Sequence, residues 1–330
     1  MIITRTPFRV SFFGGGTDFP EFYAEHGGAC LLTSIDQYCY IVIHRLSPFF
    51  KYRFRASYAR TELVQDPSEF QHPLIRESFL KLGVSEGLEM AHVSDLPGRT
   101  GLGTSSSFTV GLLHALHTYR NDRVSAEDLA REAIDVERAR VGDSGGHQDQ
   151  YAAAYGGFMR LNFSAGQHVE VRELGLPAER LRALEDHLML FYTGMECSAE
   201  TVANEQKERM RENTGALKEM LLMVDEAERV LASDSDLAPF GDLLHETWIR
   251  KKSLSTGISN SDVDQAYEAG RSAGARGGKL LGAGGRGFLL LYVEPGRQDA
   301  VRGSLSGLQE VNFGFGDAGS EVIFNAAQRE

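Results

Sequence analysis

A run of glycines and hydroxyl side chains in the first third of the chain has the composition of a polyphosphate-binding loop. The run reads Pro97-Gly98-Arg99-Thr100-Gly101-Leu102-Gly103-Thr104-Ser105-Ser106-Ser107. Glycines let backbone amides approach an anion, a helix N-terminus supplies positive potential, and a serine hydroxyl can reach the magnesium that accompanies ATP. An ordinary turn with Ser/Thr capping is the alternative. The number of glycines and hydroxyls together favours phosphate binding.

Two other nucleotide-binding motifs do not fit this sequence. No GxxxxGK[ST] string occurs, since Gly278-Lys279 is followed by Leu280. Residues 282–287 match GxGxxG, but they precede a predicted strand instead of following a strand and opening a helix. If the chain binds ATP, it therefore needs a fold other than the P-loop or Rossmann fold.

Two carboxylates flank a second glycine-rich segment, residues 142–146. Phosphoryl transfer needs oxygen ligands for magnesium and an anion near the acceptor hydroxyl. Glu137 and Asp149 could divide these two tasks. The alternative is that both are solvated surface carboxylates, which is the commonest fate of Asp and Glu.

The same segment, Gly142-Asp143-Ser144-Gly145-Gly146, also matches the GxSxG motif of serine hydrolases, and His147 lies beside it. That motif requires a strand before the serine and a helix after it. Residues 129–140 have helical spacing instead, so a serine hydrolase acting through Ser144 is a disfavoured alternative.

The predicted elements place these motifs in a mixed structure of two domains. The sequence predicts strands at residues 2–13, 38–43, 88–93, 156–163, 168–171, 188–192, 288–293 and 321–324. It predicts helices that start at Thr104 and at the capping box Ser125–Asp128, and three long helices between residues 198 and 253. We expect an N-terminal domain over residues 1–170, a C-terminal domain over residues 171–330, and the site between them.

The composition disfavours nucleic acid and membranes as binding partners. The 46 acidic residues exceed the 34 basic ones, and the net charge of −12 opposes attraction to nucleic acid or to an anionic membrane surface. No apolar run approaches the roughly 20 residues of a membrane span. Cys30, Cys39 and Cys197 are too few for a disulfide framework. We expect a cytoplasmic protein with a small-molecule substrate, and the oligomeric state stays open.

Three motifs, in this order, resemble the GHMP kinase superfamily, named for galactokinase, homoserine, mevalonate and phosphomevalonate kinases. They are residues 7–18, residues 97–107 and residues 279–285, and the resemblance covers essentially the whole chain. It implies an α+β, two-domain GHMP kinase fold with an N-terminal ribosomal-protein-S5-like domain and a C-terminal ferredoxin-like α/β domain. It also implies a phosphotransferase that uses ATP and Mg²⁺.

The resemblance implies roles for individual residues. Asp149 matches the catalytic carboxylate, and Ser105 with Glu137 matches the magnesium ligands. Arg9 matches the arginine of the first motif, which can stabilise the nucleophile or the developing phosphoryl charge. The residues expected to bind ATP are Pro97, Gly98, Gly101, Leu102, Gly103, Thr104, Ser105 and Ser106. Those expected to bind the sugar are Gly15, Gly16, Thr17 and Asp18. The C-terminal glycine loop contains Gly282, Gly284 and Gly285. A strand-surface arginine and a turn-capping aspartate are the alternatives for Arg9 and Asp18.

The first motif also bears on the acceptor. Gly15 and Gly16 stand where galactokinases have a Glu-His pair, which argues against galactose. Residues 8–20, 27–28, 34–36, 243–246 and 251–255 resemble D-glycero-D-manno-heptose 7-phosphate kinases, which phosphorylate the anomeric hydroxyl to give the 1,7-bisphosphate. The basic residues that could bind a substrate phosphate are Lys51, Arg53, Arg55, Lys251 and Lys252. Arg286 departs from the expected all-glycine loop.

Two alternatives remain within this resemblance. The chain could be a GHMP kinase for another sugar, such as L-fucose, because fold and motifs do not show whether the acceptor already carries a phosphate. It could also be a noncatalytic ATP-binding regulator, because one fold can host both catalysis and sensing. The presence of Asp149, Glu137 and Ser105 together argues against the regulator.

Overall fold

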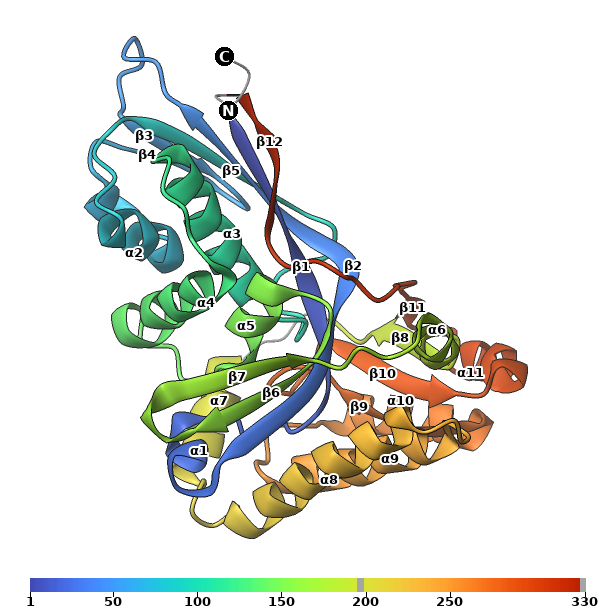
Figure 1. Ribbon diagram of the computed structural model, residues 1–330. Helices are drawn as coiled ribbons and strands as arrows, with labels where there is room; N and C mark the ends of the chain where they lie inside the picture. The colour runs from blue at the N-terminus through green and yellow to red at the C-terminus, as the bar shows by residue number, and fades with distance from the viewer. Residues whose placement is uncertain (195–198, 327–330) are drawn as a thin grey trace.

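The computed structural model describes residues 1–194 and 199–326, so Cys197 lies outside the described residues. The chain forms two β-sheets with helices packed on them, an α+β architecture (Figure 1). The predicted strands at residues 2–13, 188–192 and 288–293 are confirmed at their predicted bounds. Two long strands of the first sheet, β1 (Ile2–Phe13) and β2 (Gly28–Arg45), run through the middle of the molecule and link its two ends (Figure 1).

The first sheet is built around β1 and β2, which pair along most of their length. The order of its main path is β12 (Glu321–Asn325), β1 (Ile2–Phe13), β2 (Gly28–Arg45), β5 (Leu88–Ser94), β3 (Phe54–Ser57) and β4 (Thr61–Val64). The second half of β2 pairs with β5, while its first half pairs with β6 (Phe158–Ser164). The predicted hairpin of β6 and β7 (His168–Glu173) is confirmed.

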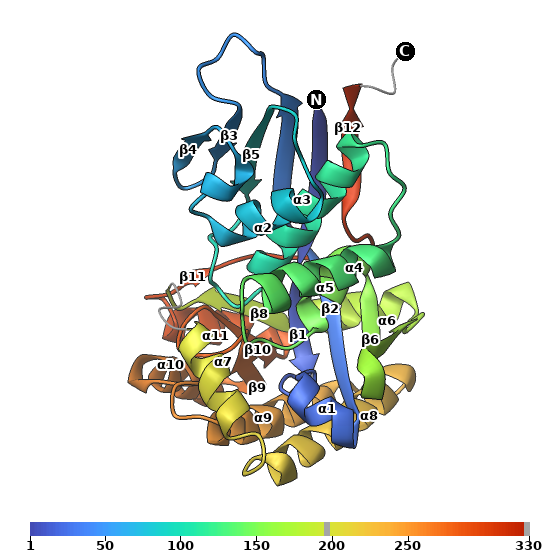
Figure 2. The ribbon, with the colours of Figure 1, turned by 90° about the vertical axis from the view of Figure 1, so that its left-hand side faces the viewer.

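Helices cover one face of this sheet and carry most of the predicted motifs. They are α2 (Pro73–Lys81), α3 (Thr104–Tyr119), α4 (Ala126–Ile134) and α5 (Gln148–Tyr155), with α1 (Pro20–His26) at the other end of the sheet. The predicted capping box of Ser125 and Asp128 is confirmed at the start of α4. A π-helical turn, Asp135–Arg140, continues α4 and contains Glu137. Figure 2 shows α4 and α5 crossing the middle of the molecule.

The second sheet is antiparallel and has the ferredoxin-like strand order. Its strands are β8 (Leu188–Tyr192), β9 (Ala275–Leu280), β10 (Phe288–Val293) and β11 (Gln309–Glu310), arranged β11-β8-β10-β9. The remaining helices are α6 (Ala178–Glu185), α7 (Ala199–Glu208), α8 (Thr214–Ala232), α9 (Ala238–Ser253), α10 (Ser261–Ala273) and α11 (Gln298–Ser304). Short 3₁₀ turns occur at Pro67–Glu69, Ala165–Gln167 and Pro295–Arg297.

One hydrophobic core joins the two sheets. Phe12 and Phe13 of β1 both make edge-to-face contacts with Phe240 of α9, at ring-centroid distances of 5.4 and 5.1 Å. All three side chains are buried. Because aromatic rings bury large apolar areas, this contact holds the two halves against each other at the level where β1 carries its functional residues.

The last strand is a correction to the sequence analysis. The segment 321–324 was expected with the second domain, but β12 pairs antiparallel with β1 in the first sheet. A short alternating segment identifies a strand without identifying its partner, because pairing across more than 300 residues is set by tertiary packing. We propose a domain division near residue 170, which falls within β7, with β12 returning to the first unit.

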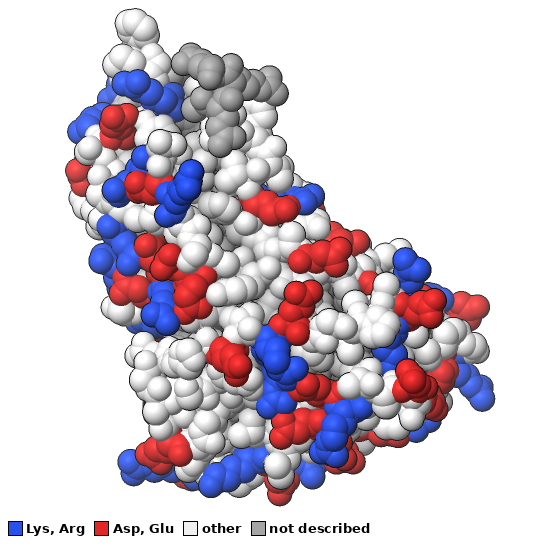
Figure 3. All heavy atoms as spheres, in the orientation of Figure 1, with Lys and Arg blue, Asp and Glu red and all other residues white. Residues whose placement is uncertain are grey.

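The surface carries mixed charge. On the face in Figure 3, acidic and basic side chains alternate across the lower half of the molecule. Ion pairs join neighbouring elements of the structure: Arg160 on β6 and Arg172 on β7 each lie within 2.8 Å of Glu228 on α8. No helix in the described part of the chain is long and apolar enough to cross a membrane.

Candidate active site

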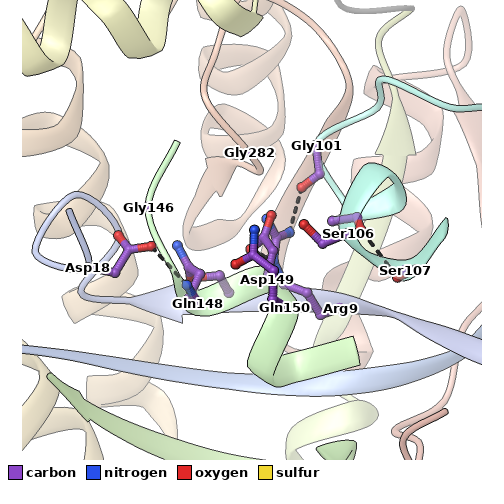
Figure 4. Close-up of polar contacts among 12 residues, drawn as sticks. Arg9, Asp18, Gly101, Ser106, Ser107, Gly146, Gln148, Asp149, Gln150 and Gly282 are labelled. Atoms are coloured by element: carbon purple, nitrogen blue, oxygen red, sulfur yellow. Dashed lines mark hydrogen bonds and ion pairs between the residues drawn. The ribbon is translucent and has the colours of Figure 1, made fainter. Parts of the chain in front are cut away.

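A bidentate ion pair forms the centre of the site. The Arg9 Nε and Nη2 atoms donate to the two carboxylate oxygens of Asp149 at 2.7 and 2.8 Å. The Arg9 Nη1 atom donates to the carbonyl oxygen of Gly101 at 2.6 Å. The Arg9 side chain is only 5% exposed, whereas that of Asp149 is 24% exposed. One guanidinium thus connects the predicted catalytic carboxylate to the predicted phosphate loop (Figure 4).

The phosphate loop approaches this pair through its backbone. Gly101 and Gly103 have φ of +81° and +71°, a region that favours glycine, and a Cβ atom on Gly103 would lie 3.1 Å from the Arg9 side chain. Leu102 is fully buried, and its carbonyl oxygen accepts a bond from the Arg9 backbone N–H. Thr104 begins α3, so the N-terminus of this helix faces the loop, as predicted.

The second glycine loop packs directly on the first. A Cβ atom on Gly282 would lie 2.4 Å from the Cα atom of Gly101, and one on Gly287 would lie 2.5 Å from the carbonyl oxygen of Thr100. Gly284 approaches Ile258 in the same way, with a φ of +132°. The 282–287 segment connects β9 to β10, so a strand does precede it, contrary to the sequence analysis. It still opens a strand and not a helix, which excludes the Rossmann arrangement.

Glu137 contacts Ser106, which is the neighbour of the serine predicted to bind magnesium with it. The Ser106 hydroxyl donates to Glu137 Oε2 at 2.9 Å, and both residues are buried. Ser105, the predicted partner, is exposed. Adjacent residues of a helix point about 100° apart, so only one of two neighbouring serines can face a given carboxylate. Burial raises the pKa of the Glu137 carboxyl.

The glycine turn near the end of β1 holds Asp18. The Asp18 carboxylate accepts bonds from the backbone N–H groups of Gly16 and Gln148 at 2.9 and 3.2 Å. Burial raises the pKa of this carboxyl, and the charge of Asp149 adds to the effect. The Thr17 hydroxyl lies 2.7 Å from the Gly14 carbonyl oxygen and 2.9 Å from the Ala29 carbonyl oxygen in β2, and it accepts a bond from the Ala29 N–H. Asp18 is thus placed beside Asp149, while the Thr17 side chain serves the turn.

Family models agree with this arrangement. Residues 73–157 match the N-terminal domain of the GHMP kinases, and residues 223–307 match the GHMP kinase C-terminal region. The chain belongs to the GHMP kinases. It is therefore a phosphotransferase with a hydroxyl group as acceptor, and ATP is the donor expected for the family.

Individual relatives and structures are consistent with this family. The chain is 28% identical to the D-glycero-alpha-D-manno-heptose 7-phosphate kinase of Campylobacter jejuni, over 94% of this chain and 96% of that protein. It is 26% identical to the bifunctional fucokinase/GDP-fucose pyrophosphorylase of Arabidopsis thaliana, over 87% of this chain and 29% of that protein. A D-glycero-D-manno-heptose 1-phosphate kinase structure from Bacteroides thetaiotaomicron matches with a TM-score of 0.79 at 23% identity, over 98% of this chain and 99% of that chain.

The kinase contains three site residues that sequence reasoning missed. Gln150 Nε2 donates to Glu137 Oε2 at 2.5 Å, and Gln148 links β1 to Asp18. Arg138 Nη2 donates to the Gly146 carbonyl oxygen at 2.6 Å and pairs with Asp143 at 3.0 Å. Gln148 and Gln150 flank Asp149, and that adjacency was the available signal, but no general spacing rule assigns a role to such glutamines.

The donor atoms around Glu137 suit a magnesium ion. Within residues 1–194 and 199–326, no three His, Cys, Asp or Glu side chains gather as a metal site. However, the buried Glu137 Oε1 atom has no hydrogen-bond partner among the described residues, and the Ser106 hydroxyl lies against the same carboxylate. A hard cation with oxygen ligands, sharing its shell with phosphate oxygens, would satisfy that atom.

The structure argues against a serine hydrolase, because His147 is not placed to act as a general base for Ser144. The Nδ1 atom of His147 lies 3.0 Å from the Tyr23 hydroxyl, and the ring is buried. Burial and the nearby Arg138 lower the pKa of His147 to about 4. Asp143 pairs with Arg138 instead of orienting a histidine. A Ser144 nucleophile would need His147 as its partner, and the structure directs that ring toward Tyr23.

The basic residues expected to bind a substrate phosphate are mostly engaged elsewhere. Arg55 pairs with Glu89, and Arg53 donates to the Ser85 carbonyl oxygen. Lys252 pairs with Asp264 at 3.1 Å. The buried Lys251 donates to the carbonyl oxygens of Leu280 and Gly282, so it supports the C-terminal loop. Lys51 lies in the exposed loop between β2 and β3.

Arg286 turns away from the phosphate loop. Its Nη2 atom pairs with Asp262 at 2.7 Å, and its Nη1 atom donates to the Thr193 carbonyl oxygen. The side chain is 42% exposed. The departure from an all-glycine loop is therefore accommodated at the outer edge of that loop.

Proposed function

We propose that this GHMP kinase transfers the γ-phosphoryl group of ATP to the anomeric hydroxyl of D-glycero-D-manno-heptose 7-phosphate, giving the 1,7-bisphosphate. The observation that carries the kinase mechanism is the Arg9 guanidinium, which donates both to Asp149 and to the Gly101 carbonyl oxygen. Acceptor activation and donor binding are thereby fixed relative to each other, which phosphoryl transfer requires.

The donor side consists of the phosphate loop and the Glu137 pocket. Backbone N–H groups of residues 98–106 and the N-terminus of α3 would bind the phosphates. Ser106 and Glu137 would hold Mg²⁺, in place of the predicted Ser105 and Glu137. When bound, the ion neutralises charge on the phosphoryl oxygens. The close packing of Gly282 against Gly101 supports the backbone of the 97–107 loop.

The acceptor side consists of Asp149, Arg9 and Asp18. Asp149 accepts a hydrogen bond from the acceptor hydroxyl and takes its proton as the oxygen bonds to the γ-phosphorus and the bond to ADP breaks. Arg9 orients the carboxylate and offsets negative charge near the phosphoryl group. Asp18 contributes carboxylate oxygens beside Asp149 for sugar hydroxyls, since each oxygen has a second lone pair.

The proposed sugar rests on the similarity of this chain to relatives that are named as sugar kinases. The relative from Campylobacter jejuni is named a heptose 7-phosphate kinase, and it matches nearly end to end. Gly15 leaves space beside Gln148, because a Cβ atom there would meet only the Gln148 Nε2 atom, at 3.6 Å, and such space suits a seven-carbon acceptor. L-Fucose is the second candidate, because the relatives from Arabidopsis thaliana and Bacteroides fragilis are both named as fucokinases.

A panel assay tests this proposal. Magnesium-dependent ADP release is measured with D-glycero-D-manno-heptose 7-phosphate, the dephosphorylated heptose, L-fucose, galactose and mevalonate. Selective turnover of the heptose 7-phosphate is expected, with the new phosphate located at C1 by ³¹P NMR. Selective turnover of L-fucose would replace the substrate and keep the mechanism. Tight ATP binding without turnover of any acceptor would favour a regulator.

A further inference from the structure

The glycine turn contains one glycine that the backbone does not require. Gly14 and Gly16 have φ of +83° and +100°, and a Cβ atom on Gly14 would lie 1.8 Å from the Ala29 carbonyl oxygen. Gly15 is not among the residues with positive φ. Among the described residues, and apart from the chain neighbours of Gly15, the only atom within 4 Å of a Cβ built there is Gln148 Nε2, at an ordinary contact distance of 3.6 Å. The fold would accept a side chain at position 15, so the glycine leaves open space beside Gln148.

Gln148 presents a fixed donor to that space. Its side-chain Oε1 atom accepts a bond from the Ser11 hydroxyl at 2.7 Å, which directs Nε2 to the opposite side of the amide. Within residues 1–194 and 199–326, Nε2 makes no hydrogen bond of its own. Both Gln148 and Gly15 are partly exposed, so a ligand can reach them.

The position of Gln148 places this donor in the acceptor site. It is the first residue of α5, immediately before Asp149, and its backbone N–H donates to Asp18 (Figure 4). The carboxylates of Asp18 and Asp149 can only accept hydrogen bonds when ionised. The Nε, Nη1 and Nη2 atoms of Arg9 already donate to Asp149 and to the Gly101 carbonyl oxygen. An acceptor oxygen over Gly15 would therefore find an amide N–H and not a carboxylate.

We propose that Gln148 is a specificity-determining residue that donates from Nε2 to an acceptor oxygen lying over Gly15. The acceptor class is a polyhydroxylated sugar, or its phosphate, with an oxygen near the reacting hydroxyl. The inference rests on the proposed sugar kinase activity, since it places the acceptor beside Asp149. It adds a recognition contact that also explains why position 15 has no side chain.

The main test compares Gln148→Leu with Gln298→Leu. Gln298 is also the first residue of a helix, α11, and it lies in a part of the chain with no role in the mechanism. For the sugar that the wild-type enzyme turns over, we expect Gln148→Leu to raise the acceptor KM about tenfold, the usual loss for one hydrogen bond. The KM for ATP should stay unchanged. Gln298→Leu should match the wild type.

Monodeoxy analogues of that sugar identify the contact. With the analogue that lacks the recognised oxygen, wild type and Gln148→Leu should have the same kcat/KM, because the donor has nothing to bind. If the oxygen belongs to the phosphate, the equalising acceptor is the dephosphorylated sugar. If Gln148→Leu loses the same factor with every analogue and with the dephosphorylated sugar, the residue has only a structural role and the proposal fails.

A double-mutant cycle with Ser11 gives an independent readout. Ser11→Ala releases the orientation of the amide and should raise the acceptor KM roughly twofold to fivefold. In the Gln148→Leu background it should add nothing, since the two residues act through one contact. Additive losses would overturn the proposal.

Gly15→Ala, which the backbone tolerates, should keep the wild-type Tm while raising the acceptor KM.

The outcomes separate this inference from the function on which it rests. If the wild-type enzyme turns over no sugar in the panel, the proposed function fails and the inference fails with it. If the wild type is active and Gln148→Leu, folded by circular dichroism, has an unchanged acceptor KM, only the inference fails.

Discussion

Asp149 and Glu137 are both carboxylates next to the phosphate loop, but their surroundings differ. Asp149 is partly exposed, and each of its oxygens accepts a bond from Arg9. Glu137 is buried, has Arg138 at 3.8 Å, and keeps one oxygen without a partner among the described residues. A carboxylate that is oriented by an arginine and partly open to solvent can receive an acceptor hydroxyl. A buried carboxylate with an unsatisfied oxygen is suited to a cation.

Because both residues are carboxylates, the two roles that we propose for them follow from their environments and not from residue type. From sequence, both residues were carboxylates flanking a glycine segment. In the structure, α5 presents Asp149 toward β1, while the π-helical turn directs Glu137 to Ser106 and Gln150. π-Helical turns occur frequently at functional sites, where they redirect a side chain without ending the helix.

Removing the charge of Asp149 should have the largest effect. Asp149→Asn keeps the size of the side chain but cannot take a proton from the acceptor, so kcat should fall about 10²-fold to 10⁴-fold. The KM for ATP should change little, because the phosphates bind to the loop. Steady-state ADP release measures both constants. A folded variant with near-normal turnover would remove Asp149 from the catalytic role.

Glu137→Gln should act through magnesium. The amide retains hydrogen-bonding capacity toward Ser106 and Gln150 but loses the charge that attracts a cation, so activity at low Mg²⁺ should fall roughly 10-fold to 100-fold. Higher Mg²⁺ should recover part of the loss. A magnesium titration of initial rates tests this, with Asp149→Asn as the comparison, since its residual rate should show the wild-type Mg²⁺ dependence. An unchanged half-saturation by Mg²⁺ in Glu137→Gln would contradict the assignment.

Substitution of Ser105 and of Ser106 tests which serine acts together with Glu137. Ser106→Ala removes the hydroxyl that contacts Glu137, so it should lower kcat/KM about tenfold and raise the Mg²⁺ concentration needed for half-saturation. Ser105→Ala, at the exposed neighbour, should change kcat/KM less than about twofold. Parallel Mg²⁺ titrations of the two variants decide between them. The reverse order of effects would restore Ser105 as the ligand.

The serine pair also shows the limit of sequence reasoning. The pattern predicted the start of α3, and it identified the glycine-rich loop and both carboxylates, because glycines, hydroxyls and caps act over a few residues. Their role in binding phosphate and magnesium stays a prediction. The pattern did not select Ser106 over Ser105, since that choice depends on the rotation of α3 relative to the turn that carries Glu137. Pairwise geometry between distant elements has no local signature.

The same limit applies to the fold. The strands with strong alternation or long apolar runs were predictable, whereas the return of β12 to β1 was not, because its partner lies more than 300 residues away. Gln148 was missed for a related reason. Its role depends on Ser11, Gly15 and Asp18, which only the folded chain brings together.

The smallest effect concerns stability, and its sign follows from burial. Because burial raises the pKa of Glu137 above the ordinary 4.5, the folded protein holds this proton more tightly than the unfolded chain. The resulting stabilisation is present below pH 4.5 and is lost as pH rises through the raised pKa. Glu137→Gln cannot lose a proton and should not show this loss. Without Mg²⁺, the difference between the Tm of Glu137→Gln and the Tm of the wild type should therefore increase as pH rises. The increase should be on the order of 1–2 °C, and the difference should then stay constant.

Thermal unfolding of both proteins across pH 4 to 8, in chelator, measures this difference. The raised pKa of Asp18 affects both proteins alike, so the difference between them isolates Glu137. Saturating Mg²⁺ and ATP should reverse the order at neutral pH, because only the wild type binds the ion through this carboxylate. A Tm difference that is independent of pH would mean that Glu137 is not a desolvated, ionisable group in the folded protein, and the contrast with Asp149 would disappear.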